Sequence, residues 1–170
     1  EQYNLTTAWD TSSLVYDNNF TVSNENQLRS LAFKYDGTKM YVTGNETEVI
    51  QQFTLSVPWD VTSATKDSTE STALTAKESN PRSIQFNSDG TIFYIGGNGT
   101  DSIHKYTLST PWDVSTLEFS QSYSFSAQVD SSVAHSIMAG FIFTANFTKL
   151  YITQDTDSRQ SQTGVNTVYE

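Results

Sequence analysis

Two blocks of sequence recur along this chain and decide its fold. In their clearest copy, the first block reads RSIQFNSDGTIFYI (residues 82–95) and the second reads YTLSTPWD (residues 106–113). The second block has two earlier copies, FTLSVPWD (residues 53–60) and YNLTTAWD (residues 3–10), and the tryptophans are 50 and 53 residues apart. A nearly fixed period of this size indicates tandem copies of one supersecondary unit.

The first block has a clear copy before it and a degraded copy after it. The clear copy is RSLAFKYDGTKMYV (residues 29–42). The degraded copy is HSIM (residues 135–138), followed after an insertion by FTANFTKLYI (residues 143–152). Asn146-Phe147 replaces the Asp-Gly pair there, so we expect the turn of the third unit to depart from the other two.

Each unit predicts four short strands, which in the second unit cover residues 82–87, 92–95, 103–108 and 117–125. Asp-Gly pairs form the first turn, because glycine reaches positive φ without steric cost. The strand 92–95 is apolar without alternation, so both of its faces must be covered. The residues that recur as structural anchors are Trp9, Trp59, Trp112, Gly37 and Gly90.

Units whose strands are buried on both faces stack into a solenoid or a propeller. We therefore expect an all-β protein of three tandem four-stranded antiparallel blades of β-propeller type, closed or extended by oligomerisation. A single repeat domain is expected over residues 1–170, with repeats at about 3–52, 53–105 and 106–170.

The repeat also resembles a known type. YTLSTPWDVST (residues 106–116), together with the Asp-Gly-Thr turn and the tyrosine-containing strand after it, resembles the β-propeller repeat of bacteriophage virion proteins and marine microbial secreted proteins. The resemblance covers nearly the whole chain. It implies a structural or adhesive module and points to no particular activity.

Composition argues against several classes of partner. With 19 acidic and 9 basic residues the net charge is −10, which disfavours nucleic acid and anionic membrane surfaces. The absence of cysteine excludes disulfides, thiolate metal sites and cysteine nucleophiles. No apolar run approaches the ~20 residues of a membrane helix. We expect neither a nucleic-acid partner nor membrane insertion.

Five Asn-x-Ser/Thr sequons are candidate glycosylation sites, and they lie at Asn4, Asn19, Asn45, Asn98 and Asn146. A chain so rich in serine and threonine also produces such triplets by chance, so both interpretations stay open. Occupied sequons require an extracellular chain. Together with the acidic composition, they favour an extracellular or virion-surface location.

The two ends of the chain match successive parts of one strand, and the residues concerned are Tyr3, Asn4, Leu5, Val168, Tyr169 and Glu170. Three blades are too few to close a ring, for which about four to eight are typical. We expect the N-terminal strand of one copy to complete the last blade of another, in a closed dimer or an open filament. The alternative is that the chain is a piece of a longer one.

No catalytic centre is recognisable in the sequence. The two histidines are His104, on the polar side of a strand, and His135, at the position held elsewhere by Arg29 and Arg82. The arginines are expected to pair with carboxylates between blades. No Gly-x-Ser-x-Gly turn supports a serine triad. The glycine-rich stretch 96–101 lacks the lysine and the helix of a phosphate loop.

Cofactors are not expected, apart from a weak case for calcium. Asp155 and Asp157 lie in an insertion of the third unit, and carboxylates suit a hard cation. Two carboxylates are few for such a site, and a solvated loop is the alternative.

These observations predict a non-catalytic, self-assembling structural subunit of an extracellular or virion assembly, such as a fibre, filament or surface layer. The alternative is a carbohydrate- or receptor-binding propeller of a phage tail fibre or adhesin, with glycans as partners. An enzyme such as a lyase or glycosidase is the third hypothesis. It requires acidic residues that converge at one end of a ring, which sequence alone does not show.

Overall fold

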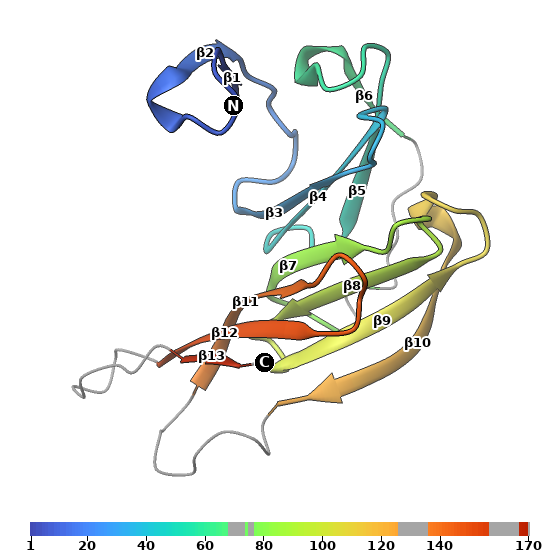
Figure 1. Cartoon of the computed structure of the whole chain (residues 1–170). Coiled ribbons are helices and arrows are strands. Elements are labelled where there is room, and N and C mark those ends of the chain that lie inside the picture. The colour runs from blue at the N-terminus through green and yellow to red at the C-terminus, as the bar shows by residue number, and fades with distance from the viewer. Residues whose placement is uncertain (68–73, 75–76, 126–135, 157–166, 170) are drawn as a thin grey trace.

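The structure is a computed structural model that describes residues 1–67, 74, 77–125, 136–156 and 167–169. The described strands form antiparallel sheets, and the described helices are short 3₁₀ turns (Figure 1). Within the described residues no helix has the length and apolar character needed to cross a membrane. The prediction of an all-β chain is confirmed.

Two complete four-stranded sheets form the middle of the chain. The first has the order β3-β4-β5-β6, with strands β3 (Leu28–Phe33), β4 (Lys39–Gly44), β5 (Ile50–Leu55) and β6 (Ala64–Lys66). The second has the order β7-β8-β9-β10, with strands β7 (Pro81–Phe86), β8 (Ile92–Gly97), β9 (Ser102–Leu108) and β10 (Leu117–Ser124). The four-stranded antiparallel unit expected from the repeat is therefore confirmed.

Two smaller sheets flank this pair. One contains β11 (Ser136–Phe143), β12 (Leu150–Thr156) and β13 (Thr167–Tyr169), in that order. The other is a hairpin of β1 (Gln2–Leu5) and β2 (Leu14–Asn18). The hairpin and β13 lie at opposite ends of the molecule (Figure 1). Among the described strands, the third sheet therefore has three members where the two middle sheets have four.

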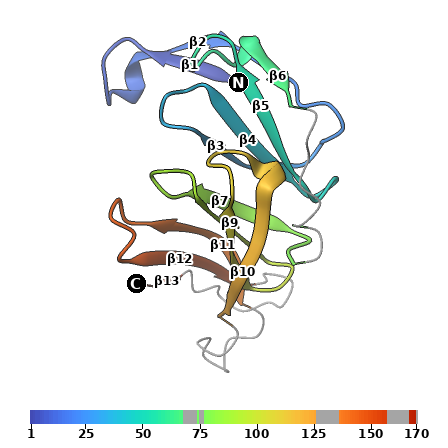
Figure 2. The same ribbon diagram turned by 90° about the vertical axis from the view of Figure 1, so that its right-hand side faces the viewer.

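The sheets stack in series, as in a row of propeller blades (Figure 2). β7 lies beside both β3 and β11, so the first strand of each blade forms a common inner edge. The core fills the gaps between sheets. Between the first and second sheets it comprises Tyr41, Ile50, Leu74, Ile84, Phe86, Phe93, Ile95, Tyr106, Leu108 and Val114. Between the second and third it comprises Ile103, Phe125, Met138, Phe141 and Ile152.

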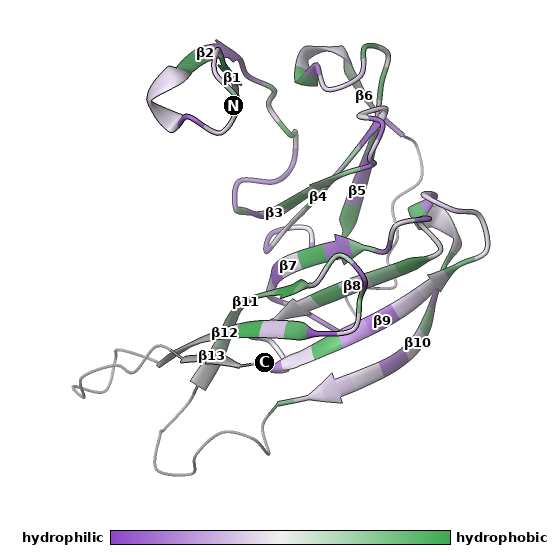
Figure 3. Cartoon of the chain, viewed as in Figure 1, coloured by the Kyte–Doolittle hydropathy of each residue, from purple (hydrophilic) through white to green (hydrophobic). Residues whose placement is uncertain are grey.

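Hydropathy follows this layering. β8 is a middle strand and its side chains are mostly buried, whereas β10, at the outer edge, is exposed along nearly its whole length. Figure 3 shows the same contrast, with apolar colour along β8 and pale or hydrophilic colour along β10. The inner and middle strands therefore supply the apolar surface that binds one blade to the next.

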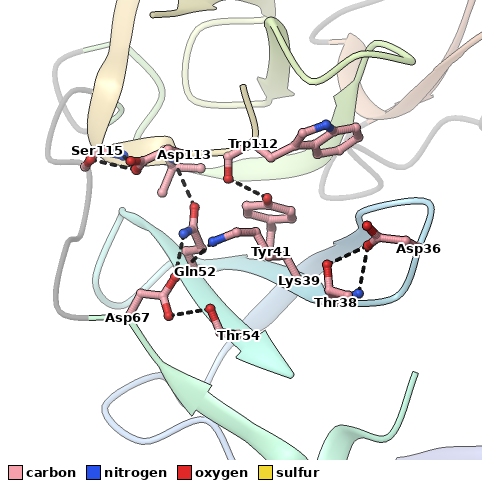
Figure 4. Close-up of polar contacts among 11 residues, drawn as sticks. Asp36, Thr38, Lys39, Tyr41, Gln52, Thr54, Asp67, Trp112, Asp113 and Ser115 are labelled. Atoms are coloured by element: carbon pink, nitrogen blue, oxygen red, sulfur yellow. Dashed lines mark hydrogen bonds and ion pairs between the residues drawn. The ribbon is translucent and has the colours of Figure 1, made fainter. Parts of the chain in front are cut away.

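Polar contacts between blades repeat with the sequence. Gln52 accepts a hydrogen bond at 3.0 Å from the backbone of Val114 in the next blade (Figure 4). Gln2 accepts an equivalent bond at 3.0 Å from the backbone of Val61. The β1–β2 hairpin therefore contacts the first blade through the same kind of bond that joins the first blade to the second.

The Asp-Gly turns lie under the tryptophans of the same blade. Gly37 and Gly90 have φ values of +72° and +74°, and a Cβ atom at either position would overlap the indole of Trp59 or Trp112. Glycine is thus required there both by the backbone and by close packing. Trp59 is nevertheless 51% exposed and Trp9 is 98% exposed. In the third unit Phe147 takes the turn position with φ +54°.

A capping aspartate follows each tryptophan. Asp113 begins a 3₁₀ turn (Val114–Thr116) and accepts a hydrogen bond from the backbone of Ser115 at 3.0 Å (Figure 4). Asp10 and Asp60 cap the equivalent turns in the same way. This is the local hydrogen bonding that favours aspartate at turns and caps.

Candidate functional site

An arginine stands near the start of each of two inner strands. In β3 the pairing with β4 shifts register between Leu28, which lies opposite Gly44, and Ser30. In β7 the pairing with β8 shifts in the same way between Pro81, which lies opposite Gly97, and Ser83. Arg29 and Arg82 are therefore the extra residues of two equivalent β-bulges. A bulge re-aims the side chain at its extra residue and often lies beside a functional site.

The two arginines lie on adjacent strands. The backbone of Ile84 donates a hydrogen bond at 3.2 Å to the hydroxyl of Ser30. Ser30 directly follows Arg29, and Ile84 lies two residues after Arg82. Arg29 is exposed and Arg82 is partly exposed. Both side chains therefore start from the same end of the inner edge and can be reached by solvent.

Two asparagines organise this end of the blades. With the Asn45 amide oriented to satisfy its neighbours, its oxygen accepts from Nε and Nη2 of Arg29 at 3.2 Å, and its nitrogen donates to Asn80 Oδ1 at 2.8 Å. Arg29 Nη2 also donates to Gln27 Oε1 at 3.2 Å. Asn45 belongs to the first blade and Asn80 leads into the second. These contacts fix Arg29 at the junction of the two blades.

Buried glutamates bind the backbone of the turns at the same end of the blades. Glu78 is fully buried and accepts hydrogen bonds from the backbones of Asn80 and Gly99, both at 2.9 Å, and from Thr100 Oγ1 at 3.0 Å. Glu25 has the same role in the first blade, where it accepts bonds from the backbones of Gln27, Glu46 and Thr47 and from the Thr47 hydroxyl.

These hydrogen bonds lower the pKa of Glu25. Burial alone would raise the pKa of Glu25, but hydrogen bonds from the backbones of Thr47 and Gln27, with help from the Thr47 hydroxyl, outweigh it and hold that pKa below its ordinary value. Glu25 thus favours its charged form, and both glutamates are engaged by their own turns. No described carboxylate forms an ion pair with Arg29 or Arg82.

The described residues therefore give no support to the expectation that the arginines pair with carboxylates between blades, which stays a prediction. Among the described contacts, Arg29 is bound by neutral amides. Its positive charge is therefore available to a ligand, as is that of Arg82. In a chain of net charge −10, two arginines that no described carboxylate pairs with, at one end of adjacent strands, mark a candidate site for an anion.

Comparisons with known proteins support the fold. No family model matches the chain, and no curated protein matches it either. A protein of Bacteroides uniformis, provisionally named a 6-phosphogluconolactonase, is similar at TM-score 0.56 and 13% identity over 96% of this chain. A protein of Bacteroides fragilis with the same provisional name has TM-score 0.55 and 15% identity over 92% of the chain. A protein of Lactobacillus plantarum has TM-score 0.58 and 11% identity over 99% of the chain.

At such identities the likeness shows the fold, which is of β-propeller type. The chain spans 49% of the Bacteroides uniformis protein, 41% of the Bacteroides fragilis protein and 49% of the Lactobacillus plantarum protein. It therefore corresponds to about half of each of these proteins.

The comparisons contradict the expected function. The expectation of a non-catalytic structural or virion subunit is wrong, and so is the alternative of a glycan- or receptor-binding adhesion module, because proteins that share the fold carry the name of a lactonase. The expectation rested on the lack of a local catalytic motif. Function lies in a site and not in the fold, and a site built from residues far apart in sequence leaves no contiguous motif.

The other residues singled out from the sequence lie in varied surroundings. Asn4, Asn19 and Asn146 are exposed, whereas Asn45 and Asn98 are partly buried at blade turns. His135, Asp157 and Glu170 lie outside the described residues. In the described part of the chain no cluster of three histidines or acidic residues could hold a metal ion. The calcium site stays a prediction.

The sequence indicated Asn45 only as a glycosylation candidate, and it gave no expectation for Asn80 or for the buried glutamates. One signal was available, because Glu25 and Glu78 each precede the repeated arginine by four residues. The contact of Asn45 with Asn80 joins two blades and had no comparable signal.

Proposed function

We propose that the chain forms part of a propeller-type hydrolase that opens an anionic lactone, with Arg29 and Arg82 binding the anionic group of the substrate. The observation that carries the proposal is the pair of arginines that, among the described residues, have no carboxylate partner at one end of the inner strands. The names of two proteins with the same fold support the reaction class.

The chemistry of the arginines fits such a substrate. A guanidinium group can donate two parallel hydrogen bonds to a phosphate or a carboxylate. Hydrolysis of a lactone adds water to the carbonyl carbon, breaks the ring C–O bond and yields a hydroxy acid. Arg29, held by Asn45 and Gln27, has the restrained position that binding the anionic group needs.

The experiment measures hydrolysis of 6-phosphogluconolactone by proton release, with the unphosphorylated lactone as a second substrate. Arg29→Gln and Arg82→Gln should each raise KM for the phosphorylated lactone by about 10-fold or more, since a hydrogen bond to a charged group contributes about 1.5–3 kcal/mol. Lys149→Gln removes the same charge from the exposed β11–β12 turn and is the matched control. Equal effects of all three variants would contradict the proposal.

We also propose that a second copy of the chain supplies the remaining blades. The β1–β2 hairpin exposes Leu5 at 46%, Leu14 at 48% and Val15 at 54%. Covering these side chains would remove apolar surface from water. Sedimentation should then give about twice the chain mass of 19.0 kDa. A species of 19.0 kDa at micromolar concentration would refute this proposal.

The origin and location of the chain are further proposals. Kinship of the repeat with that of phage virion and marine secreted proteins is supported by YTLSTPWDVST and the Asp-Gly-Thr turn. It concerns the repeat alone and implies no virion role. An extracellular location is supported by the sequons. A mass increase on Asn4 or Asn19 in chain secreted by a eukaryotic host would support it further, because both side chains are exposed.

A further inference from the structure

A buried histidine in the second blade joins an exposed serine to a buried acid. His104 lies in the middle of β9 and is 3% exposed. Its Nδ1 is 2.7 Å from the hydroxyl of Ser122 on β10, and its Nε2 is 3.0 Å from the hydroxyl of Thr100. Thr100 in turn lies 3.0 Å from Glu78 Oε2. Ser122 is exposed, so the chain of contacts runs from the buried carboxylate out to the surface.

The number of hydrogens on each group fixes the direction of these hydrogen bonds. The Thr100 hydroxyl has one hydrogen, which it donates to the Glu78 carboxylate. Its oxygen must therefore accept from His104, so Nε2 carries the ring proton. In the neutral ring Nδ1 is then an acceptor, and its partner is the Ser122 hydroxyl. This is the geometry of a general base in contact with a nucleophile.

The histidine is poised to accept a proton. Burial lowers the pKa of His104, and nearby Lys77 lowers it further, while Glu78 and a hydrogen bond to the Lys77 backbone oppose the shift. Glu78 Oε2 is 3.9 Å from Nε2, so the acid can stabilise the imidazolium once it forms. The ring is therefore neutral at neutral pH, and Nδ1 has a free lone pair for a proton.

Comparison with the first blade shows which of these residues are needed for the fold of a blade. The Glu25–Thr47 pair corresponds to Glu78–Thr100 and makes the same bonds, but Gln51 stands where the second blade has His104. The glutamate–threonine pair therefore serves the fold of both blades. The histidine is an addition of the second blade, and a glutamine at its place is compatible with a blade.

We propose that Ser122 is an activated nucleophile that takes an acyl or phosphoryl group from an ester-type electrophile, with His104 as general base and Thr100 and Glu78 as positioning residues. Neither arginine takes part, so the inference is independent of the proposed function. Ser122 Oγ forms a bond to the electrophilic carbon or phosphorus while its proton passes to His104 Nδ1. The imidazolium then gives that proton to the leaving oxygen, and water later releases the group by the reverse path.

A fluorophosphonate tests this inference on the full-length chain. Ser122 Oγ would displace fluoride from phosphorus, the serine proton would pass to His104, and peptide mass spectrometry would find the phosphonyl adduct on Ser122. Labelling should disappear in Ser122→Ala and persist in Ser120→Ala, an exposed serine of the same strand. His104→Gln, which copies the first blade, should slow labelling by about 100-fold or more, the usual worth of a general base.

The pH profile distinguishes a base from a merely structural histidine. The labelling rate should rise with pH along a titration whose midpoint lies below 6.5, the ordinary pKa of histidine, and Thr100→Val should move that midpoint. Labelling of Ser122 no faster than that of Ser120, or an unchanged rate in His104→Gln with the fold intact by circular dichroism, would overturn the inference.

Discussion

Replacement of Gly90 by alanine tests the blade turn quantitatively. The residue has φ +74°, and a left-handed conformation costs an alanine about 1–2 kcal/mol. The added Cβ would also overlap the Trp112 indole, which packs on Phe86 with ring centroids 5.1 Å apart. An aromatic pair of this kind contributes about 0.5–1.5 kcal/mol beyond its buried area. We therefore expect Gly90→Ala to lower the free energy of unfolding by about 2–4 kcal/mol.

Urea unfolding followed by tryptophan fluorescence measures this loss. The matched control is Gly140→Ala, where an added Cβ would meet only Thr153 Oγ1 at 3.5 Å and no positive φ is involved. That substitution should change the unfolding free energy by less than about 1 kcal/mol. Equal unfolding free energies for the two variants would refute the assignment of Gly90 to a strained, tryptophan-covered turn.

Three further variants test other parts of the structure. Trp59→Ala should cost about 1–3 kcal/mol in a urea titration, because the side chain is 51% exposed, whereas Trp9→Ala, 98% exposed, should cost almost nothing; equal losses would contradict this difference. Glu78→Gln should cost about 2–4 kcal/mol in the same assay, since it weakens three bonds to a buried carboxylate, and wild-type stability would argue against that role. The lowered pKa of His104 means that the unfolded chain binds protons more readily below pH 6.5, so stability should fall as pH drops through that value. His104→Gln should remove this part of the pH dependence, and an unchanged profile would contradict it.

The repeat made the strands predictable. Alternating or continuous apolar residues, Asp-Gly turns and the spacing of the blocks located β7 to β10, because these signals act between residues close in sequence. The periodicity also favoured packed tryptophans. It did not show that Trp9 would be exposed, since that depends on which strands lie beside the hairpin.

The candidate site was much less predictable, for a physical reason. The contact of His104 with Ser122 depends on strand register, and the pairing of β9 with β10 shifts between Phe119 and Gln121. Such an irregularity decides which side chains share a face, and no sequence signal marked it. The arginines were visible as repeats, but the contact of Asn45 with Asn80 beside Arg29 was not, because the two asparagines come from different blades.

The most direct test of the proposed anion-binding role of Arg29 and Arg82 is a ratio of two values of kcat/KM. The first is that for 6-phosphogluconolactone, and the second is that for the unphosphorylated lactone. This ratio isolates the part of substrate recognition that the arginines contribute. We expect a ratio above about 10 for the wild-type chain, and a fall toward 1 in the double variant Arg29→Gln/Arg82→Gln, with Lys149→Gln unchanged. A wild-type chain that hydrolyses neither lactone, or a ratio that survives the loss of both arginines, would contradict the proposed role.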